Sequence, residues 1–377
     1  MDAAPLHLLP MASSHRGPMS PACSQCAEGK KMVLFVTGLC RFRCFYCPVS
    51  ERRNQIDVAY ANERRIHADA DVIDEARAMG AEGTGITGGD PLGVIDRTAH
   101  YVELLKREFG PSHNIHLYTH EPNPEKLRRL ADAGLDEFRL HIPHYLWGPL
   151  ASRGGAYRTV LEQAPDWGIR RGVEIPVLPE RERELRHLLS TLAEIGVDFV
   201  NLNELEFSET NEANLRGRGY ALDPRGGWGV LGSRAVAERV VRDCRVSVPV
   251  HYCSSRFKDG VQLKQRLLRR LERTAPRYAV STGEGTIIVG IVEPPADADL
   301  DLAGHTVARL AGLGSEDYRV DPVRRRVELG PRPLRRVARR LPFPAFVVEE
   351  YPTADALEVE RTPLNRPARP TVPAGGR

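Results

Sequence analysis

The 377-residue sequence lacks any apolar run long enough to cross a membrane, and it shows no secretory signal. We therefore expect a cytoplasmic protein with no membrane partner. It also has little excess charge, because 53 Lys and Arg residues face 50 Asp and Glu residues and leave a formal net charge of +3. Global charge thus neither favours nor excludes a nucleic-acid partner. Cysteine is scarce, at 7 residues, and a reducing cytoplasm argues against pairing them all in disulfides.

Three of these cysteines lie in one short loop, at Cys40, Cys44 and Cys47. Three thiolates on a tight loop can hold three irons of a 4Fe-4S cluster and leave the fourth iron open to a small ligand. The alternative is a structural zinc site, but zinc takes four ligands there and usually uses two CxxC-type pairs. The spacing of three residues and then two, with the aromatic Tyr46 before the last cysteine, resembles the signature of the radical S-adenosylmethionine (radical SAM) superfamily.

The resemblance implies two cofactors: a 4Fe-4S cluster held by the three loop cysteines, and S-adenosylmethionine (SAM) bound at the open iron. It also implies that Tyr46 lies by the adenine of SAM. A second segment, Gly88-Gly89-Asp90-Pro91, resembles the Gly-Gly-Glu-Pro segment of the family, with aspartate in place of glutamate. In the family this backbone accepts the methionyl ammonium, so we expect the same of Gly88, Gly89 and Asp90.

Strand-like and helical patterns alternate from residue 31 onward, which predicts parallel strands joined by right-handed helical crossovers. The expected strands are 32–37, 83–87, 114–119, 137–142, 171–177 and 198–207, and the expected helices are 68–79, 98–108, 124–133, 157–166 and 181–195. The cysteine loop would follow the first strand, at the active-site end of such folds. We therefore predict an α/β fold: a partial (β/α)6 TIM-like barrel over 31–255, with a smaller α+β, ferredoxin-like C-terminal domain.

The later strands are unusually polar for a buried sheet. Strand residues two apart share a face, and burying many polar groups is costly unless they bind something. We therefore expect them to line the barrel interior; the alternative is that several sit in strand-end loops and contact only water. Candidates for the ribose or adenine of SAM are Glu174, Asn201 and Asn203, and candidates for substrate contacts are His120, Arg139 and His141.

The other cysteines suggest a second metal site. Cys23 and Cys26 form a CxxC motif before the first strand, and Cys253 lies in the run 251–255 after the sixth unit. Together with His251 they could bind zinc or an auxiliary iron-sulfur cluster, and thiolates suit both. The alternative is an unmetallated CxxC in a flexible arm. Cys244 lies on an apolar helical stretch, where a buried thiol is ordinary.

The remaining segments are expected to differ from the barrel. Residues 1–30 read as a loose arm carrying the CxxC, 256–355 as a basic helix followed by a βαββαβ arrangement, and 356–377 as a disordered tail. The second helix of that arrangement has a basic face, which suggests RNA or another polyanion; the alternative is a solvated face. Its arginines are Arg332, Arg335, Arg336, Arg339 and Arg340.

Taken together, the sequence predicts a radical SAM enzyme that reductively cleaves SAM and starts radical chemistry on an unidentified substrate. RNA or protein modification or activation is the favoured reading, with a small metabolite left open and a reductant such as ferredoxin or flavodoxin required. Residues 33–40, 44–48 and 251–255 resemble archaeal radical SAM proteins related to pyruvate formate-lyase activating enzyme. The alternative is a non-enzymatic, zinc-stabilised nucleic-acid-binding protein.

Overall fold

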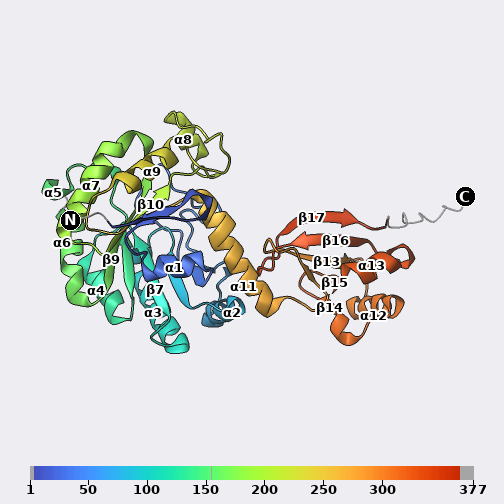
Figure 1. Ribbon diagram of the computed structural model, residues 1–377. Helices are drawn as coiled ribbons and strands as arrows, with labels where there is room; N and C mark the ends of the chain where they lie inside the picture. Colours follow the sequence, from blue (N-terminus) through green and yellow to red (C-terminus); the bar gives the residue numbers. More distant parts are fainter. Residues whose placement is uncertain (1–3, 154, 366–377) are drawn as a thin grey trace, which may run out of the picture. The chain divides into compact units, whose positions relative to one another are not determined.

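A computed structural model describes residues 4–153 and 155–365 of the chain (Figure 1). The chain divides into two compact units, Met1–Arg266 and Leu267–Arg377. The boundary falls inside helix α11 (Lys264–Thr274). Among the described residues, no helix combines the length and the apolarity that a membrane span requires.

The first unit is built on a parallel sheet. Each of its parallel strands pairs with the next in the order β3, β6, β7, β8, β9, β10, β11. Their bounds are β3 (Lys31–Phe35), β6 (Gly83–Thr87), β7 (Asn114–Thr119), β8 (Glu137–Leu140), β9 (Arg170–Val177), β10 (Phe199–Glu204) and β11 (Val250–Cys253). The six predicted strands are confirmed, with ends that differ by up to three residues. β11 is the strand-like run expected after the sixth unit.

Amphipathic helices connect these strands and cover the outer face of the sheet (Figure 1). α7, for example, buries Leu185, Leu188, Leu189 and Leu192, and each buried leucine contributes about 1.5–3 kcal/mol relative to exposure. The longer helices are α2 (Asp69–Met79), α3 (Ile95–Phe109), α4 (Pro124–Asp132), α6 (Gly155–Gln163), α7 (Glu182–Ile195) and α9 (Ser233–Asp243). Shorter ones are α5 (Leu150–Arg153), α8 (Glu212–Gly217), α10 (Ser255–Phe257) and the π-helix Lys258–Leu263.

Short antiparallel strands extend both edges of this sheet. On one side, β4 (Tyr60–Ala61) and β5 (Arg64–Arg65) follow β3. On the other side, β2 (Ser14–Arg16) pairs with β11, and β1 (Leu6–Leu8) pairs with β2. The expectation of a loose N-terminal arm is therefore wrong for these residues.

The CxxC segment is also ordered, as helix α1 (Pro21–Ala27). Ser20 caps this helix by accepting a hydrogen bond from the Cys23 N–H, and Pro21 occupies its first position, where a missing N–H costs nothing. The helix lies on the inner face of the sheet, since its Cys23 thiol contacts the β8 side chain of Arg139. The N-terminal segment thus helps to close the interior of the first unit.

The second unit contains one antiparallel sheet with the strand order β14-β15-β13-β16-β17, and β12 (Val280–Ser281) pairs with β13. Its main elements are β13 (Ile287–Val292), α12 (Leu300–Ala311), β14 (Tyr318–Asp321), β15 (Arg326–Leu329), α13 (Pro331–Val337), β16 (Ala345–Glu350) and β17 (Glu358–Pro363). The expected disordered tail is wrong for β17, which pairs with β16. Residues 366–377 of that expectation lie outside the described residues.

Candidate active site

The three loop cysteines follow β3, as predicted, and lie at the carboxyl edge of the parallel sheet. All three thiols are partly exposed, and all line a cavity of about 900 Å³. Other walls of this cavity come from residues at the ends of β6 to β10 and from Lys258 of the π-helix. The cavity is therefore placed where loops after parallel strands converge.

An ion pair between Asp57 and Arg97 fixes the start of the cysteine loop. The sequence analysis did not predict it. The Thr37 hydroxyl donates to the Asp57 carboxylate at 2.9 Å. Arg97 donates to both oxygens of Asp57 at 2.6 and 3.0 Å and to the Val36 carbonyl at 2.9 Å. The hydrogen bond from Arg97 lowers the pKa of Asp57. Three segments distant in sequence thus hold the loop in place, and no local motif marks them.

Gly88 and Gly89 pack directly against the cysteine loop. A Cβ atom on Gly88 would lie 2.5 Å from the Thr37 carbonyl oxygen, and one on Gly89 would lie 2.2 Å from the Leu39 carbonyl oxygen. The Gly89 N–H donates to the Thr37 carbonyl at 2.6 Å. Both glycines also line the cavity. Contact between two backbones therefore requires glycine here, whatever ligand the cavity binds.

The Asp90 carboxylate points away from the cavity. It is 3% exposed and accepts hydrogen bonds from the Thr119 hydroxyl at 2.8 Å and from the backbone N–H groups of Leu92, His120 and Glu121. Burial raises the pKa of this carboxyl group, and the hydrogen bonds from Thr119 and the backbone oppose that effect. The side chain thus ties the end of β6 to the end of β7.

Arg139 is the central cation of the barrel interior and is 2% exposed. Its guanidinium pairs with Glu137 at 2.8 Å and with Glu174 at 2.7 Å, and it contacts the Tyr118 hydroxyl at 3.1 Å. Two buried carboxylates therefore share one buried cation, so each carboxylate has an ion-pair partner while the three groups together keep one negative charge.

Glu174 also organises the two asparagines that the sequence reading placed near SAM. It accepts a hydrogen bond from Asn201 at 2.8 Å and from Asn203 at 2.7 Å. Glu174, Arg139 and Asn203 line the cavity. Asn201 lies behind this layer, where its side-chain oxygen faces the His251 Nδ1 atom at 2.6 Å. The structure thus brings Glu174 and Asn203 to the cavity but places Asn201 one layer deeper.

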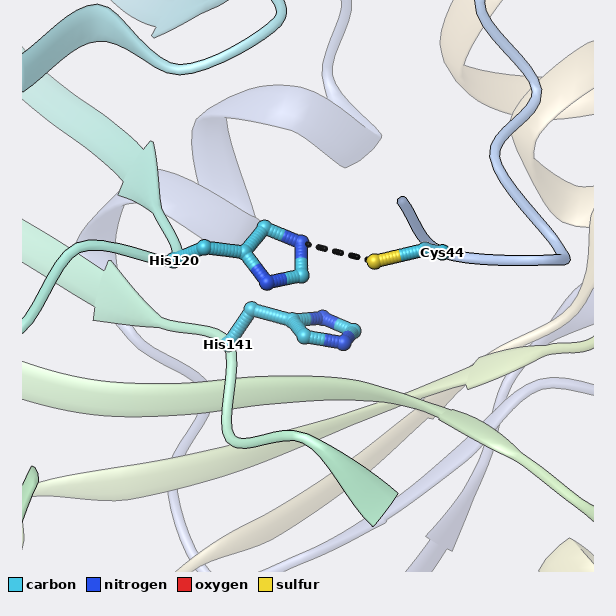
Figure 2. Close-up of side chains that lie close together, drawn as sticks. All are labelled: Cys44, His120 and His141. Atoms are coloured by element: carbon cyan, nitrogen blue, oxygen red, sulfur yellow. Dashed lines mark hydrogen bonds between the residues drawn. The ribbon is translucent and has the colours of Figure 1, made fainter. Parts of the chain in front are cut away.

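Tyr46, His120 and His141 form an aromatic wall beside the cysteine loop. The Tyr46 hydroxyl is 2.8 Å from the His141 Nε2 atom, and the rings of His120 and His141 lie 3.9 Å apart. Figure 2 shows His120 pointing toward the sulfur of Cys44, at 3.6 Å. All three residues line the cavity, as the sequence reading expected of the two histidines.

Cys23, Cys26 and Cys253 are not gathered at the spacing of one metal ion. Within the described part of the chain, the three-residue group whose ligand atoms all lie within 4.8 Å of one another is Cys44, His120 and His141. The Cys23 thiol instead contacts Arg139, and the Cys253 thiol contacts the Gln262 side chain at 3.5 Å. Burial raises the pKa of both thiols, which favours the neutral form. The geometry therefore does not support a single zinc ion at these residues.

A lysine and a glutamate in the cavity wall received no role from the sequence. Lys258 begins the π-helix and pairs with Glu206 at 3.0 Å. π-Helical turns are rare and are frequent at functional sites. The sequence feature that could have pointed to Lys258 is its position, three residues after the 251–255 run.

Comparisons with known proteins bear on this site. Residues 34–192 match the radical SAM superfamily, and residues 285–364 match a domain of unknown function, DUF8061. The chain is 36% identical over 360 residues to the Methanocaldococcus jannaschii protein called "Putative glycyl-radical enzyme activating enzyme MJ0021". That alignment covers 91% of this chain and 92% of the relative.

Two solved structures show weaker likeness. Streptococcus suis SuiB bound to S-adenosylmethionine is 11% identical, with a TM-score of 0.41, over 60% of this chain and 50% of that chain. A spore photoproduct lyase mutant is 14% identical, with a TM-score of 0.38, over 60% of this chain and 81% of that chain. The chain thus spans half the length of SuiB.

Three thiols on a loop at the carboxyl edge of a parallel sheet, beside a polar cavity, match in number and chemistry the donor set of an iron-sulfur enzyme. The chain belongs to the radical SAM superfamily. It is therefore an enzyme of a family that uses a 4Fe-4S cluster and SAM, as predicted. The alternative of a non-enzymatic zinc-stabilised binding protein is not supported.

Proposed function

We propose that Cys40, Cys44 and Cys47 hold the 4Fe-4S cluster and that SAM binds in the adjoining cavity. The observation that carries this proposal is the position of all three thiols on the wall of one cavity of about 900 Å³. That volume is at the upper end of the roughly 300–1,000 Å³ typical of ligand sites, which leaves room for a substrate group beside SAM. When bound, the cluster supplies one electron that cleaves the SAM sulfonium to methionine and a 5'-deoxyadenosyl radical.

The protein's own residues position and shield the reactants in this proposal. Gly88 and Gly89 leave backbone carbonyls open to the methionyl ammonium, and Tyr46 lies by the adenine. Asn203 and Glu174 contact the ribose, and their mutual hydrogen bond fixes the orientation of both side chains. Asp90 acts through the backbone that it holds, because its carboxylate is buried away from the cavity.

For the substrate, we propose a protein on which the enzyme generates a radical. The support is the name of the archaeal relative, which shares 36% identity over nearly the whole chain. Electrons would come from a reductant such as ferredoxin or flavodoxin. RNA modification is the competing outcome, and the exposed arginines of the second unit are the feature that favours it.

The architecture supports finer fold assignments as well. We propose that the first unit is a partial TIM-like barrel, because its parallel strands and outer helices follow one another in a regular βα order. We propose that the second unit is a ferredoxin-like sandwich extended by β17. Its element order is βαββαβ, and its strand order β14-β15-β13-β16 is that of such a sandwich.

The test is anaerobic reconstitution with iron and sulfide, followed by assay of 5'-deoxyadenosine and methionine with SAM and dithionite. We expect about four irons per chain and product formation in the natural protein, and loss of both when Cys40, Cys44 and Cys47 are replaced by alanine. Cys244→Ala is the matched control, because this buried thiol lies outside the cavity. Full iron content in the triple variant would refute the assignment.

The substrate proposal needs a separate readout. Loaded enzyme, SAM and reductant are added to a native anaerobic extract, and organic radicals are followed by electron paramagnetic resonance (EPR). A radical that resides on polypeptide and requires the enzyme supports the proposal. SAM cleavage accompanied only by modified nucleosides in RNA would replace it.

A further inference from the structure

His120 lies at the end of β7 with its side chain directed at one cysteine of the loop. Its Nε2 atom is 3.6 Å from the Cys44 sulfur, within hydrogen-bonding distance of a sulfur acceptor (Figure 2). Its other ring nitrogen, Nδ1, is buried without a hydrogen-bond partner among the described residues. The Cys44 sulfur is therefore the polar atom that this imidazole faces.

The His120 ring is held in this orientation from several sides. Phe42 of the cysteine loop stacks on one side at 4.9 Å and 24°, and His141 lies on the ring at 3.9 Å and 37°. The His120 backbone N–H donates to the Asp90 carboxylate at 3.0 Å. Ring contacts and a backbone anchor thus limit how far the imidazole can turn from the sulfur.

His141 cannot serve as an equivalent donor to the sulfur. Its Nε2 atom faces the Tyr46 hydroxyl at 2.8 Å, and its ring packs against the rings of Tyr46 and His120. These contacts also weaken the case for one divalent ion shared by Cys44, His120 and His141, although their ligand atoms lie within 4.8 Å of one another. His141 instead acts as a wall for His120.

We propose that His120 is a positioning residue that donates a hydrogen bond from Nε2–H to the Cys44 thiolate and thereby raises the reduction potential of the cluster. A ligating thiolate carries no proton, so the imidazole must be the donor. Hydrogen bonds to cluster sulfurs stabilise the more negative, reduced state, which makes the potential less negative. This inference rests on the proposed assignment of Cys44 as a cluster ligand.

The experiment compares His120→Ala, His120→Gln and the natural protein after anaerobic reconstitution. Iron content is measured first, and the midpoint potential is then obtained from an EPR-monitored redox titration without SAM. We expect His120→Ala to keep its iron and to titrate at a lower potential. His120→Gln can place an amide N–H near the sulfur, so its potential should lie closer to that of the natural protein.

His144→Ala is the matched control, because His144 packs on Phe45 and does not line the cavity. An unchanged midpoint potential in loaded His120→Ala would overturn the proposal. So would loss of all iron in both His120 variants together with binding of one zinc ion by the Cys40→Ala, Cys47→Ala double variant, which would establish a single-ion site instead. Failure of the proposed function shows differently, as a natural protein that takes up no iron.

Discussion

Gly89→Ala should disturb the cysteine loop before it affects any ligand. The new Cβ atom would lie 2.2 Å from the Leu39 carbonyl oxygen and 2.6 Å from the Gly38 carbonyl oxygen. Both neighbours are backbone atoms, so neither can rotate away as a flexible side chain would. Overpacking of this kind costs about 1–3 kcal/mol, and a large unit loses about 2–4 °C of melting temperature per kcal/mol.

We therefore expect Gly89→Ala to melt several degrees lower and to take up less iron. Gly93→Ala is the control from the same segment, because a Cβ atom there would meet nothing within 4 Å. Calorimetry and iron analysis of both variants provide the measurement. If Gly89→Ala matched Gly93→Ala in melting temperature and iron content and lost only SAM affinity, the packing argument would be refuted, and close approach of SAM would be the reason for glycine.

The other predictions test separate parts of the molecule. Arg139→Met strands two buried carboxylates and should cost about 3–5 kcal/mol in urea denaturation; a cost below about 1 kcal/mol would contradict its role. Burial, aided by Lys31 and Lys106, lowers the pKa of His113 to about 4, against about 6.5 unfolded. Its contribution to stability is thus present above about pH 6.5 and is lost as pH falls toward 4. His113→Asn should therefore reduce the change in unfolding free energy of the apoprotein between about pH 6.5 and pH 4. Replacing Cys23, Cys26 and Cys253 with alanine should leave the zinc and iron content unchanged. A lower metal content would support the hypothesis of a second metal site at these residues. If the substrate is RNA instead of a protein, the exposed arginines should give tRNA binding that weakens steeply with salt and is lost when glutamine replaces Arg335, Arg336, Arg339 and Arg340; salt-insensitive binding would argue against docking there.

The βα repeat could be predicted because each strand and helix carries its own local pattern. α7 shows this, since its leucines recur at helical spacing and all are buried. The N-terminal strands were missed because β1 and β2 have three residues each, too few for a pattern to show. β2 is ordered by pairing with β11, more than 230 residues away in the sequence, and β1 is ordered by pairing with β2. Similarly, β17 forms by adding to an existing sheet edge.

The candidate site divides along the same line. The cysteine triad could be predicted from the sequence because its three residues lie close together in the chain and their spacing is specific. Asn201 and Asn203 cannot be told apart from the sequence, because they are the same residue type two positions apart on one strand. In the structure both donate a hydrogen bond to Glu174. Only the structure shows that Asn203 reaches the cavity while Asn201 faces His251 behind it. Depth along a strand is set by the neighbouring strands and not by the residue itself.

Asp90 shows how one substitution can shift a role without removing the site. Its carboxylate accepts four hydrogen bonds from the ends of β6 and β7, and one of these fixes the backbone of His120. A longer glutamate would have to fold back to reach the same donors, so the shorter side chain suits this packing. The residue thus links the glycine segment, which supports the cysteine loop, to the histidine that faces Cys44. We therefore expect a substitution of Asp90 to change the iron content or midpoint potential of the cluster as well as the affinity for SAM.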